Sequence, residues 1–125
     1  MTDLPARDLA LTLAHVLDEK SGEDIQVLKL PKGQLCDFVI VVTGRSDRQV
    51  RSLADEIRSW CKDQGVDSRP VEGESGWLLV DCIDVVVHAL TQEMRDYYRL
   101  ERLWGEATPI EWAADAAAKA KAKRS

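Results

Sequence analysis

The sequence predicts a single α/β domain in which helices flank a mixed β-sheet. Segments with a strand-like apolar pattern alternate with segments whose apolar residues recur at helical spacing, in the order α-β-β-α-β-β-β-α. No repeat or linker interrupts the chain before Gly105, and 125 residues with 45% hydrophobic content suffice for one core. We therefore expect one domain over residues 1–104. An Ala- and Lys-rich tail over 105–125 is expected to be mobile unless Trp112 docks.

The N-terminal segment predicts a helix followed by a half-exposed strand. We expect the helix to begin near Asp3, with Pro5 in its first turn, because the missing proline N–H costs nothing there. The Ser-Gly pair at 21–22 ends the helix. Residues 24–30 alternate apolar and polar side chains, which is typical of a strand with one solvated face.

The next segment predicts a buried strand followed by a long helix. Residues 36–44 (CDFVIVVTG) form a dense valine-rich run that suits a strand covered on both faces. Ser46 and Gln49 have the spacing of a capping box, in which each residue satisfies a backbone N–H at the other. The helix ends at Gly65. Its predicted core-facing residues are Val50, Leu53, Ala54, Ile57 and Cys61.

The last third predicts a short strand near 68–73, a hairpin, and a helix from about Thr91 to Trp104. With Cys82 and Ile83 as the hairpin turn, Leu79 lies opposite Val86 and Trp77 opposite His88. Because side chains alternate along a strand, two different faces result. The core face collects Leu78, Val80, Val85, Val87 and Ala89, and the other face collects Trp77, Leu79, Asp81, Asp84, Val86 and His88.

The second of these faces mixes aromatic, aliphatic, acidic and imidazole side chains, which is typical of a contact surface. The following helix carries two rows. One row is apolar and is expected to pack on the sheet, although it contains Glu101. The other is basic and would meet acids or phosphates, or more commonly water. The apolar row is Met94, Tyr97, Leu100 and Trp104, and the basic row is Arg95, Arg99 and Arg102.

Charge and cysteine content restrict the class of protein. The net charge of −5 disfavours a general nucleic-acid coat, but residues 119–125 carry +4 and the remaining 118 residues −9. The basic end allows peripheral contact with RNA. Three cysteines without CxxC spacing argue against a disulfide frame or a zinc site and indicate a reducing, cytoplasmic compartment. The N-terminal segment lacks a basic n-region and carries acids early, so we do not expect a secretory signal, and no apolar stretch approaches the length of a membrane span.

The residues around the hairpin allow two catalytic interpretations. His88 as a general base would need a nucleophile, and Cys82 is the one local candidate, with no third orienting group. A strand histidine bonded to a neighbour, or a binding role, explains His88 better. Asp81 and Asp84 could serve a two-metal nucleotidyltransferase site, and residues 43–46 (TGRS) invite comparison with a phosphate loop. Both observations have simpler explanations, because the glycine spacing of a Walker phosphate loop is absent and aspartate is common beside turns for local reasons. The sequence therefore gives little support to a nucleotidyltransferase site.

Four segments together carry a resemblance to a known family: CDFVIVVTGRSDRQV, VEG, GWLLVDCIDVVVHAL and RDYYRLERLW. They resemble the ribosomal silencing factor, or Iojap-like, family over about residues 21–104. The paired signature is specific. It comprises Trp77, Asp81, Val87 and His88, followed by Tyr98, Leu100, Glu101, Leu103 and Trp104.

The resemblance implies a nucleotidyltransferase-like α/β fold that lacks catalytic carboxylates and needs no cofactor or metal. It also implies binding to the large ribosomal subunit at ribosomal protein fourteen, which sterically blocks joining of the small subunit and represses translation. Homodimers occur in the family, although nothing in this sequence shows one. The alternative interpretation is a nucleotidyltransferase-like enzyme with metal-dependent activity.

Fourteen positions match the family pattern. Among these positions and the second face of the hairpin, the expected partner-binding residues are Trp77 as an aromatic anchor, Leu79, His88 and Tyr98. Arg95 and Asp81 are further candidates, and Asp81 could instead help to hold the fold. Asp37, Glu101 and Leu103 are expected to hold the fold. The matching positions are Asp37, Ser46, Arg48, Glu72, Gly73, Trp77, Asp81, His88, Glu93, Arg95, Tyr98, Leu100, Glu101 and Trp104.

The chain departs from the family pattern in three places. Ile83 stands in the hairpin turn where glycine is usual, and Cys82 precedes it where an aromatic residue is common, so the turn type is expected to differ. Asp47 places an acid beside Ser46. The tail after Gly105 is longer than usual, and its basic end would add contacts to ribosomal RNA.

Overall fold

Six strands form one mixed sheet in the order β3-β4-β5-β2-β1-β6 in the computed structural model, which describes residues 5–99, 102 and 105–123. This confirms the predicted α/β architecture and adds two elements, β6 and α4. In chain order the elements are α1 (Ala6–Glu19), β1 (Glu23–Lys29), β2 (Phe38–Gly44), α2 (Asp47–Gln64), β3 (Glu72–Glu74), β4 (Trp77–Asp81), β5 (Val85–Thr91), α3 (Gln92–Tyr98), β6 (Thr108–Ile110) and α4 (Ala116–Ala122).

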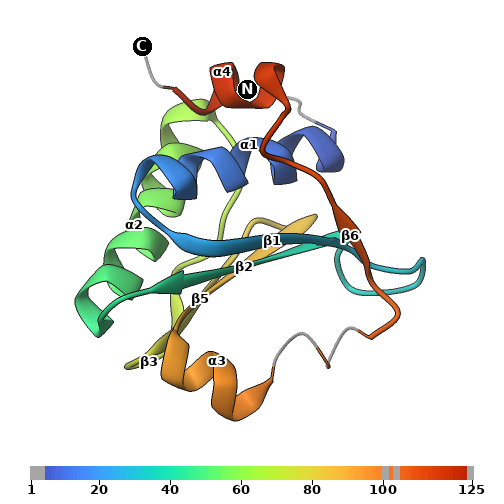
Figure 1. Cartoon of the computed structure of the whole chain (residues 1–125). Helices are drawn as coiled ribbons and strands as arrows, with labels where there is room; N and C mark the ends of the chain where they lie inside the picture. Colours follow the sequence, from blue (N-terminus) through green and yellow to red (C-terminus); the bar gives the residue numbers. More distant parts are fainter. Residues whose placement is uncertain (1–4, 100–101, 103–104, 124–125) are drawn as a thin grey trace.

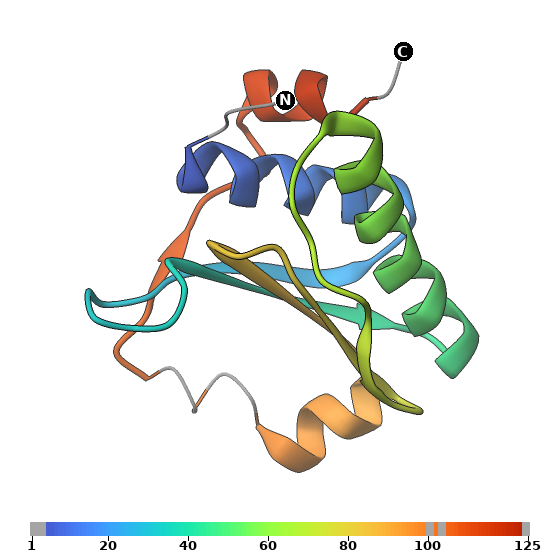
Figure 2. The ribbon, with the colours of Figure 1, turned by 180° about the vertical axis from the view of Figure 1, so that it is seen from behind.

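Helices cover the two faces of the sheet unequally. α1, α2 and α4 lie over one face, and α3 lies on the other (Figure 1). β2 and β5 are parallel neighbours, and the other described strand pairs are antiparallel. The chain between β2 and β5 passes through α2 and an irregular segment that descends to β3, seen from behind in Figure 2. That strand begins at Glu72, later than the 68–73 segment predicted.

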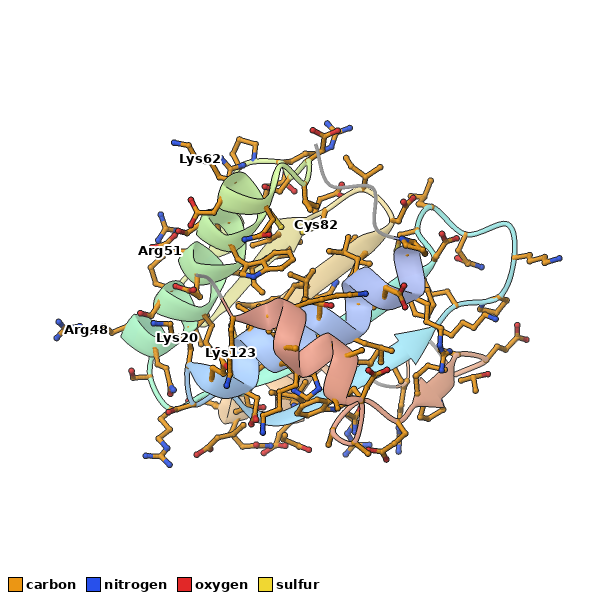
Figure 3. All side chains as sticks on the ribbon, turned by 90° about the horizontal axis from the view of Figure 1, so that it is seen from above. Lys20, Arg48, Arg51, Lys62, Cys82 and Lys123 are labelled. Atoms are coloured by element: carbon orange, nitrogen blue, oxygen red, sulfur yellow. The ribbon has the colours of Figure 1, made fainter. Side chains whose placement is uncertain are left out.

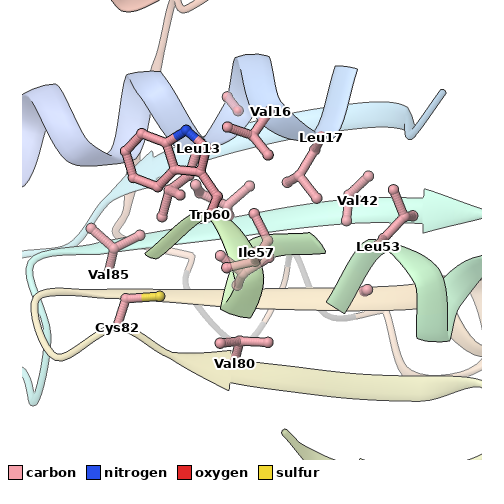
Figure 4. Close-up of a cluster of buried hydrophobic side chains, with 14 of the residues drawn as sticks. Leu13, Val16, Leu17, Val42, Leu53, Ile57, Trp60, Val80, Cys82 and Val85 are labelled. Atoms are coloured by element: carbon pink, nitrogen blue, oxygen red, sulfur yellow. The ribbon is translucent and has the colours of Figure 1, made fainter. Parts of the chain in front are cut away.

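The main core lies between the sheet and the α1–α2 layer (Figure 4). Every residue of β2 is buried, as the valine-rich run predicts. The five core positions predicted for α2 are all buried, and Trp60, which the sequence reasoning missed, is the largest fully buried side chain of the set. Its indole N–H donates to the Ala122 carbonyl 3.1 Å away, so the core reaches into the C-terminal helix.

The helix ends agree with the sequence in outline. α1 begins at Ala6 with Pro5 as its N-cap rather than in its first turn, while Asp3 lies outside the described residues. The Ser46 hydroxyl accepts the Gln49 N–H at 3.1 Å, which is half of the predicted capping box. The other half is wrong, because the Gln49 side-chain oxygen accepts from the N–H of Arg45 at 2.6 Å.

The sequence predicts a mobile C-terminal tail unless Trp112 docks on the domain, and in the structure Trp112 does dock. Its indole N–H donates to the Ile25 carbonyl at 3.2 Å, its own carbonyl lies 2.9 Å from His15 Nε2, and the two rings meet edge to face with centroids 5.1 Å apart. β6 pairs with β1, and α4 buries Ala118 and Ala122. The segment from β6 to α4 is thus packed onto the domain. None of the helices in the described part of the chain combines the length and apolarity that crossing a bilayer requires.

The hairpin turn lies one residue later than predicted. Leu79 pairs with His88 and Trp77 with Leu90, so the observed register differs by two positions from the prediction. Since side chains alternate with period two, a shift of two leaves every residue of the two strands on its predicted face. The turn is tight at Ile83, whose φ of 71° is rare for a β-branched residue.

α3 is shorter than the predicted helix. It ends at Tyr98, because Arg99 adopts a left-handed φ of 48°. Leu100, Glu101, Leu103 and Trp104 lie outside the described residues, so their predicted packing stays a prediction. Within the described helix the apolar row is partly wrong. Tyr97 is 77% exposed, whereas Met94 packs against the sheet as expected.

The strained turn gives a stability prediction. Ile83→Gly removes the steric cost of a left-handed β-branched residue, which is about 1 kcal/mol, while little apolar contact is lost because the side chain is 45% exposed. We expect a higher urea midpoint with an unchanged slope. Ile83→Ala keeps a Cβ in the same backbone conformation and is the matched control. An equal gain from both variants would show that backbone strain is not the cause.

Candidate functional site

One face of the β4–β5 hairpin forms a partly open surface, which we term the mixed face and define as Trp77, Leu79, Asp81, Val86 and His88. The first four side chains are half-buried and His88 is 9% exposed. Their neighbours on the opposite face of the same strands are buried in the main core. The predicted division of the hairpin is therefore confirmed, except that Asp84 lies in the turn rather than in a strand.

Three aromatic side chains form a connected group at one end of the mixed face. The Trp77 indole N–H donates to His88 Nδ1 at 3.2 Å. The Trp77 ring also lies 5.0 Å from the Tyr98 ring, centroid to centroid, and Tyr97 meets Tyr98 edge to face at 4.8 Å. The indole is thus held in one orientation by contacts from β5 and from the end of α3, which reduces the ordering cost of binding a partner.

Burial lowers the pKa of His88 to about 4, from an ordinary value near 6.5. The ring is therefore neutral at pH 7, and its Nδ1 lone pair is available to accept the Trp77 N–H. A neutral, accepting imidazole suits a positioning role for Trp77.

Beside this aromatic group lies an apolar hollow of about 290 Å³. Gly73, which lines the hollow, permits the close approach of β3 to β4, because a Cβ there would clash with the Trp77 carbonyl oxygen and the φ of 115° is unfavourable for other residues. Sequence reasoning missed Glu74, Ser75 and Met94 as lining residues, although the Ser-Gly pair at 75–76 is a turn signal. The lining residues are Gly73, Glu74, Ser75, Trp77, Leu79, Met94 and Tyr98.

The family model described as "RsfS: Ribosomal silencing factor during starvation" matches residues 3–125. The chain belongs to the RsfS family.

Individual relatives support the same family assignment. A protein of Chromobacterium violaceum named "Ribosomal silencing factor RsfS" is 42% identical over 106 residues, covering 82% of this chain and 87% of its own length. A crystal structure of a protein from the same species superposes with a TM-score of 0.77 at 36% identity and covers 93% of this chain and 98% of that one. A mouse protein named "Mitochondrial assembly of ribosomal large subunit protein 1" is 29% identical over 98 residues, covering 74% of this chain and 43% of its own length.

In this RsfS-family chain the Asp81 carboxylate is engaged in the turn. It accepts the Ile83 N–H at 2.8 Å and lies 3.6 Å from the Arg69 guanidinium. Asp84 contributes its backbone carbonyl, which accepts the N–H groups of Asp37 and Phe38. Among the described residues no group of three or more His, Cys, Asp or Glu side chains is arranged to hold a metal ion.

The candidate nucleophile is also placed away from His88. Cys82 is 2% exposed and packs in the main core, on the side of the sheet opposite to the mixed face, with its sulfur 3.8 Å from that of Cys61. The hydrogen bond with Cys61 and, after it, burial raise the pKa of the Cys82 thiol. A thiol in this setting is a poor nucleophile. The TGRS segment likewise ends in a helix cap, since Ser46 Oγ accepts a backbone N–H.

Arg95 lies inside the protein instead of on a surface row. Its guanidinium is 4% exposed and donates at 2.8 Å to both the Asp24 carbonyl and the Thr43 hydroxyl, with the Asp24 carboxylate 3.6 Å away. It joins α3 to β1 and β2, which indicates a structural role. Arg99 and Arg102 are exposed, so the predicted basic row is divided between interior and surface.

His88 gives a pH prediction. The folded-state pKa of about 4 lies below the unfolded value near 6.5, so unfolded chains bind more protons as the pH falls. The stabilising contribution is present above about pH 6.5 and is lost toward pH 4, by about 2 kcal/mol between pH 7 and pH 5. We expect His88→Gln to flatten this part of the urea-unfolding profile. An NMR titration of wild type showing a His88 pKa near 6.5 would contradict the assignment.

Proposed function

We propose that this protein is a ribosomal silencing factor that binds the large ribosomal subunit through the mixed face and the adjoining hollow. Membership of the RsfS family supports a role on the ribosome. The name of the mouse relative, which refers to assembly of the large subunit, supports that subunit as the partner. The binding partner within it is ribosomal protein fourteen, as the sequence resemblance implies.

The observation that carries the proposal is the positioned indole of Trp77 at the edge of an apolar hollow. Hydrophobic anchors that are already ordered before binding commonly supply most of the energy of a protein–protein interface. Leu79 lies beside the indole, and Tyr98, 47% exposed, presents a ring with a polar tip. A partner that fills the hollow would remove these rings from water without first ordering them.

The proposed mechanism is steric exclusion and requires no chemical step. A protein of this size, bound on the face of the large subunit that meets the small subunit, competes with subunit joining by mass action. Repression then depends on the concentration and affinity of the factor and is reversed when it dissociates. Asp81 and Cys82, the two residues most relevant to the enzymatic alternatives, are committed to a turn and to the core. We therefore propose a regulator that is not an enzyme.

Three further features stay predictions. A cytoplasmic location follows from the cysteine content and the proposed ribosomal partner. A homodimer is implied only by the family resemblance. Contact of the basic tail with ribosomal RNA rests on Lys119, Lys121 and Lys123, which are exposed on or beside α4.

Replacing the anchor tests the proposal. Trp77→Ala should weaken binding to purified large subunits by about 30-fold or more, the loss typical of an interface hot spot. It should also remove the slowing of subunit association, followed by light scattering. Tyr98→Ala, at the exposed end of α3, should weaken binding in the same direction with less effect on folding.

Leu35→Ala is the matched control, because this fully exposed apolar side chain precedes β2, at the end of the sheet opposite to the hollow. Circular dichroism and urea unfolding verify that each variant is folded. Wild-type protein that neither sediments with large subunits nor slows association would overturn the proposed function. Equal binding by wild type and both aromatic variants would place the interface elsewhere on the molecule.

A further inference from the structure

The outer side of α2 carries a row of cations, which we term the basic stripe and define as Arg48, Arg51, Arg58 and Lys62. At 3.6 residues per turn these four positions fall within about 80° of the helix circumference. The opposite side of the helix is buried against the sheet and α1. Arg48, Arg51 and Lys62 extend from the same outer side of α2 in Figure 3.

Most of the acidic residues that lie near these cations in the sequence of α2 are outside the basic stripe in the structure. Asp47 accepts the Ser75 hydroxyl at the start of the helix, and Glu56 points toward Lys20, 3.9 Å away. Asp55 is the one acid within the arc of the stripe, 3.6 Å from Arg51 on an exposed surface. The four cations of the stripe together with Asp55 therefore sum to +3, on a chain whose net charge is −5.

The dimensions of the stripe suit a nucleic-acid backbone. From Arg48 to Lys62 the helix rises about 21 Å at 1.5 Å per residue. Duplex nucleic acid carries about one negative charge per 1.7 Å of its axis, so the stripe spans several phosphates. Arginine and lysine are the side chains that bind phosphates most often, in part because the arginine fork donates two hydrogen bonds at once.

The position of the stripe connects it to the mixed face. The hydrogen bond between Ser75 and Asp47 joins the first turn of α2 to the β3–β4 turn. Ser75 is also a lining residue of the apolar hollow. The Arg48 end of the stripe thus lies near the rim of the surface that we assign to the protein partner, and the stripe runs away from that rim along the flank of the domain.

We propose that the basic stripe binds the phosphate backbone of ribosomal RNA while the mixed face holds the protein partner. This inference rests on the proposed function, because a ribosomal partner places RNA beside the docked protein. The acidic charge of the whole chain opposes binding to RNA in general. Docking of the mixed face raises the effective concentration of RNA phosphates at the stripe, so a modest local contact adds affinity and fixes the orientation of the factor.

Salt dependence of large-subunit binding tests the inference. The triple variant Arg48→Gln, Arg51→Gln, Lys62→Gln removes three cations, and Arg58 is kept because it donates to the Ser68 carbonyl at 3.1 Å. Each lost phosphate contact should reduce the slope of log K against log salt by about one, so we expect a slope smaller by about three. The control, Arg7→Gln, Lys29→Gln, Lys32→Gln, changes net charge equally at exposed positions outside α2 and should keep the wild-type slope.

Hydroxyl-radical footprinting of ribosomal RNA in subunits saturated with each protein identifies what the stripe contacts. Wild type and control should protect a stretch of RNA backbone that the stripe variant leaves open. Equal slopes for stripe variant and control would overturn the inference while leaving the proposed function intact. A reduced slope with unchanged RNA protection would mean that the stripe meets an acidic protein, which also overturns it. Absence of wild-type binding would overturn the proposed function and this inference together.

Discussion

The antiparallel pairing of β4 with β5 is the constraint on which the rest of the structure depends. It places Val80 opposite Val87 on the core side and Leu79 opposite His88 on the other. Because alternation assigns neighbouring residues to opposite faces, burial of the valines forces the polar and aromatic side chains outward together. The parallel pairing of β5 with β2 then anchors this hairpin to the centre of the sheet. The proposed binding surface is thus the reverse side of a core.

Uneven coverage of the sheet leaves that surface open. Three helices cover the core side, one of them α4 in the docked C-terminal segment, whereas the short α3 covers only part of the other side (Figure 1). The buried Arg95 bonds hold α3 to β1 and β2, so its last residue, Tyr98, stays against Trp77. Arg95 thereby supports the aromatic group from the inside. These internal bonds give Arg95 a structural role, and its contact with a partner stays a prediction.

The sequence predicted the parts of the fold that depend on local periodicity. The two faces of the hairpin were correct even though the register was off by two, because a period of two makes the faces insensitive to that shift. Properties that depend on tertiary contacts were not predicted. The end of α3 is not marked by a glycine, because the residue with the left-handed backbone conformation there is Arg99. Helical spacing alone also does not predict that the Arg95 side chain is buried. Docking of the tail depends on Trp112 meeting His15, some 97 residues away in the sequence.

The central claim is that the mixed face contacts a protein of the large ribosomal subunit, and site-specific photocrosslinking tests it most directly. A photoreactive residue at Glu74, exposed at the rim of the hollow, is compared with one at Arg7, exposed on the helical layer. The account predicts that Glu74, unlike Arg7, crosslinks to ribosomal protein fourteen in bound large subunits, and that Trp77→Ala removes the product. Crosslinking to that protein from Arg7 but not from Glu74 would contradict the account and move the interface to the helical side.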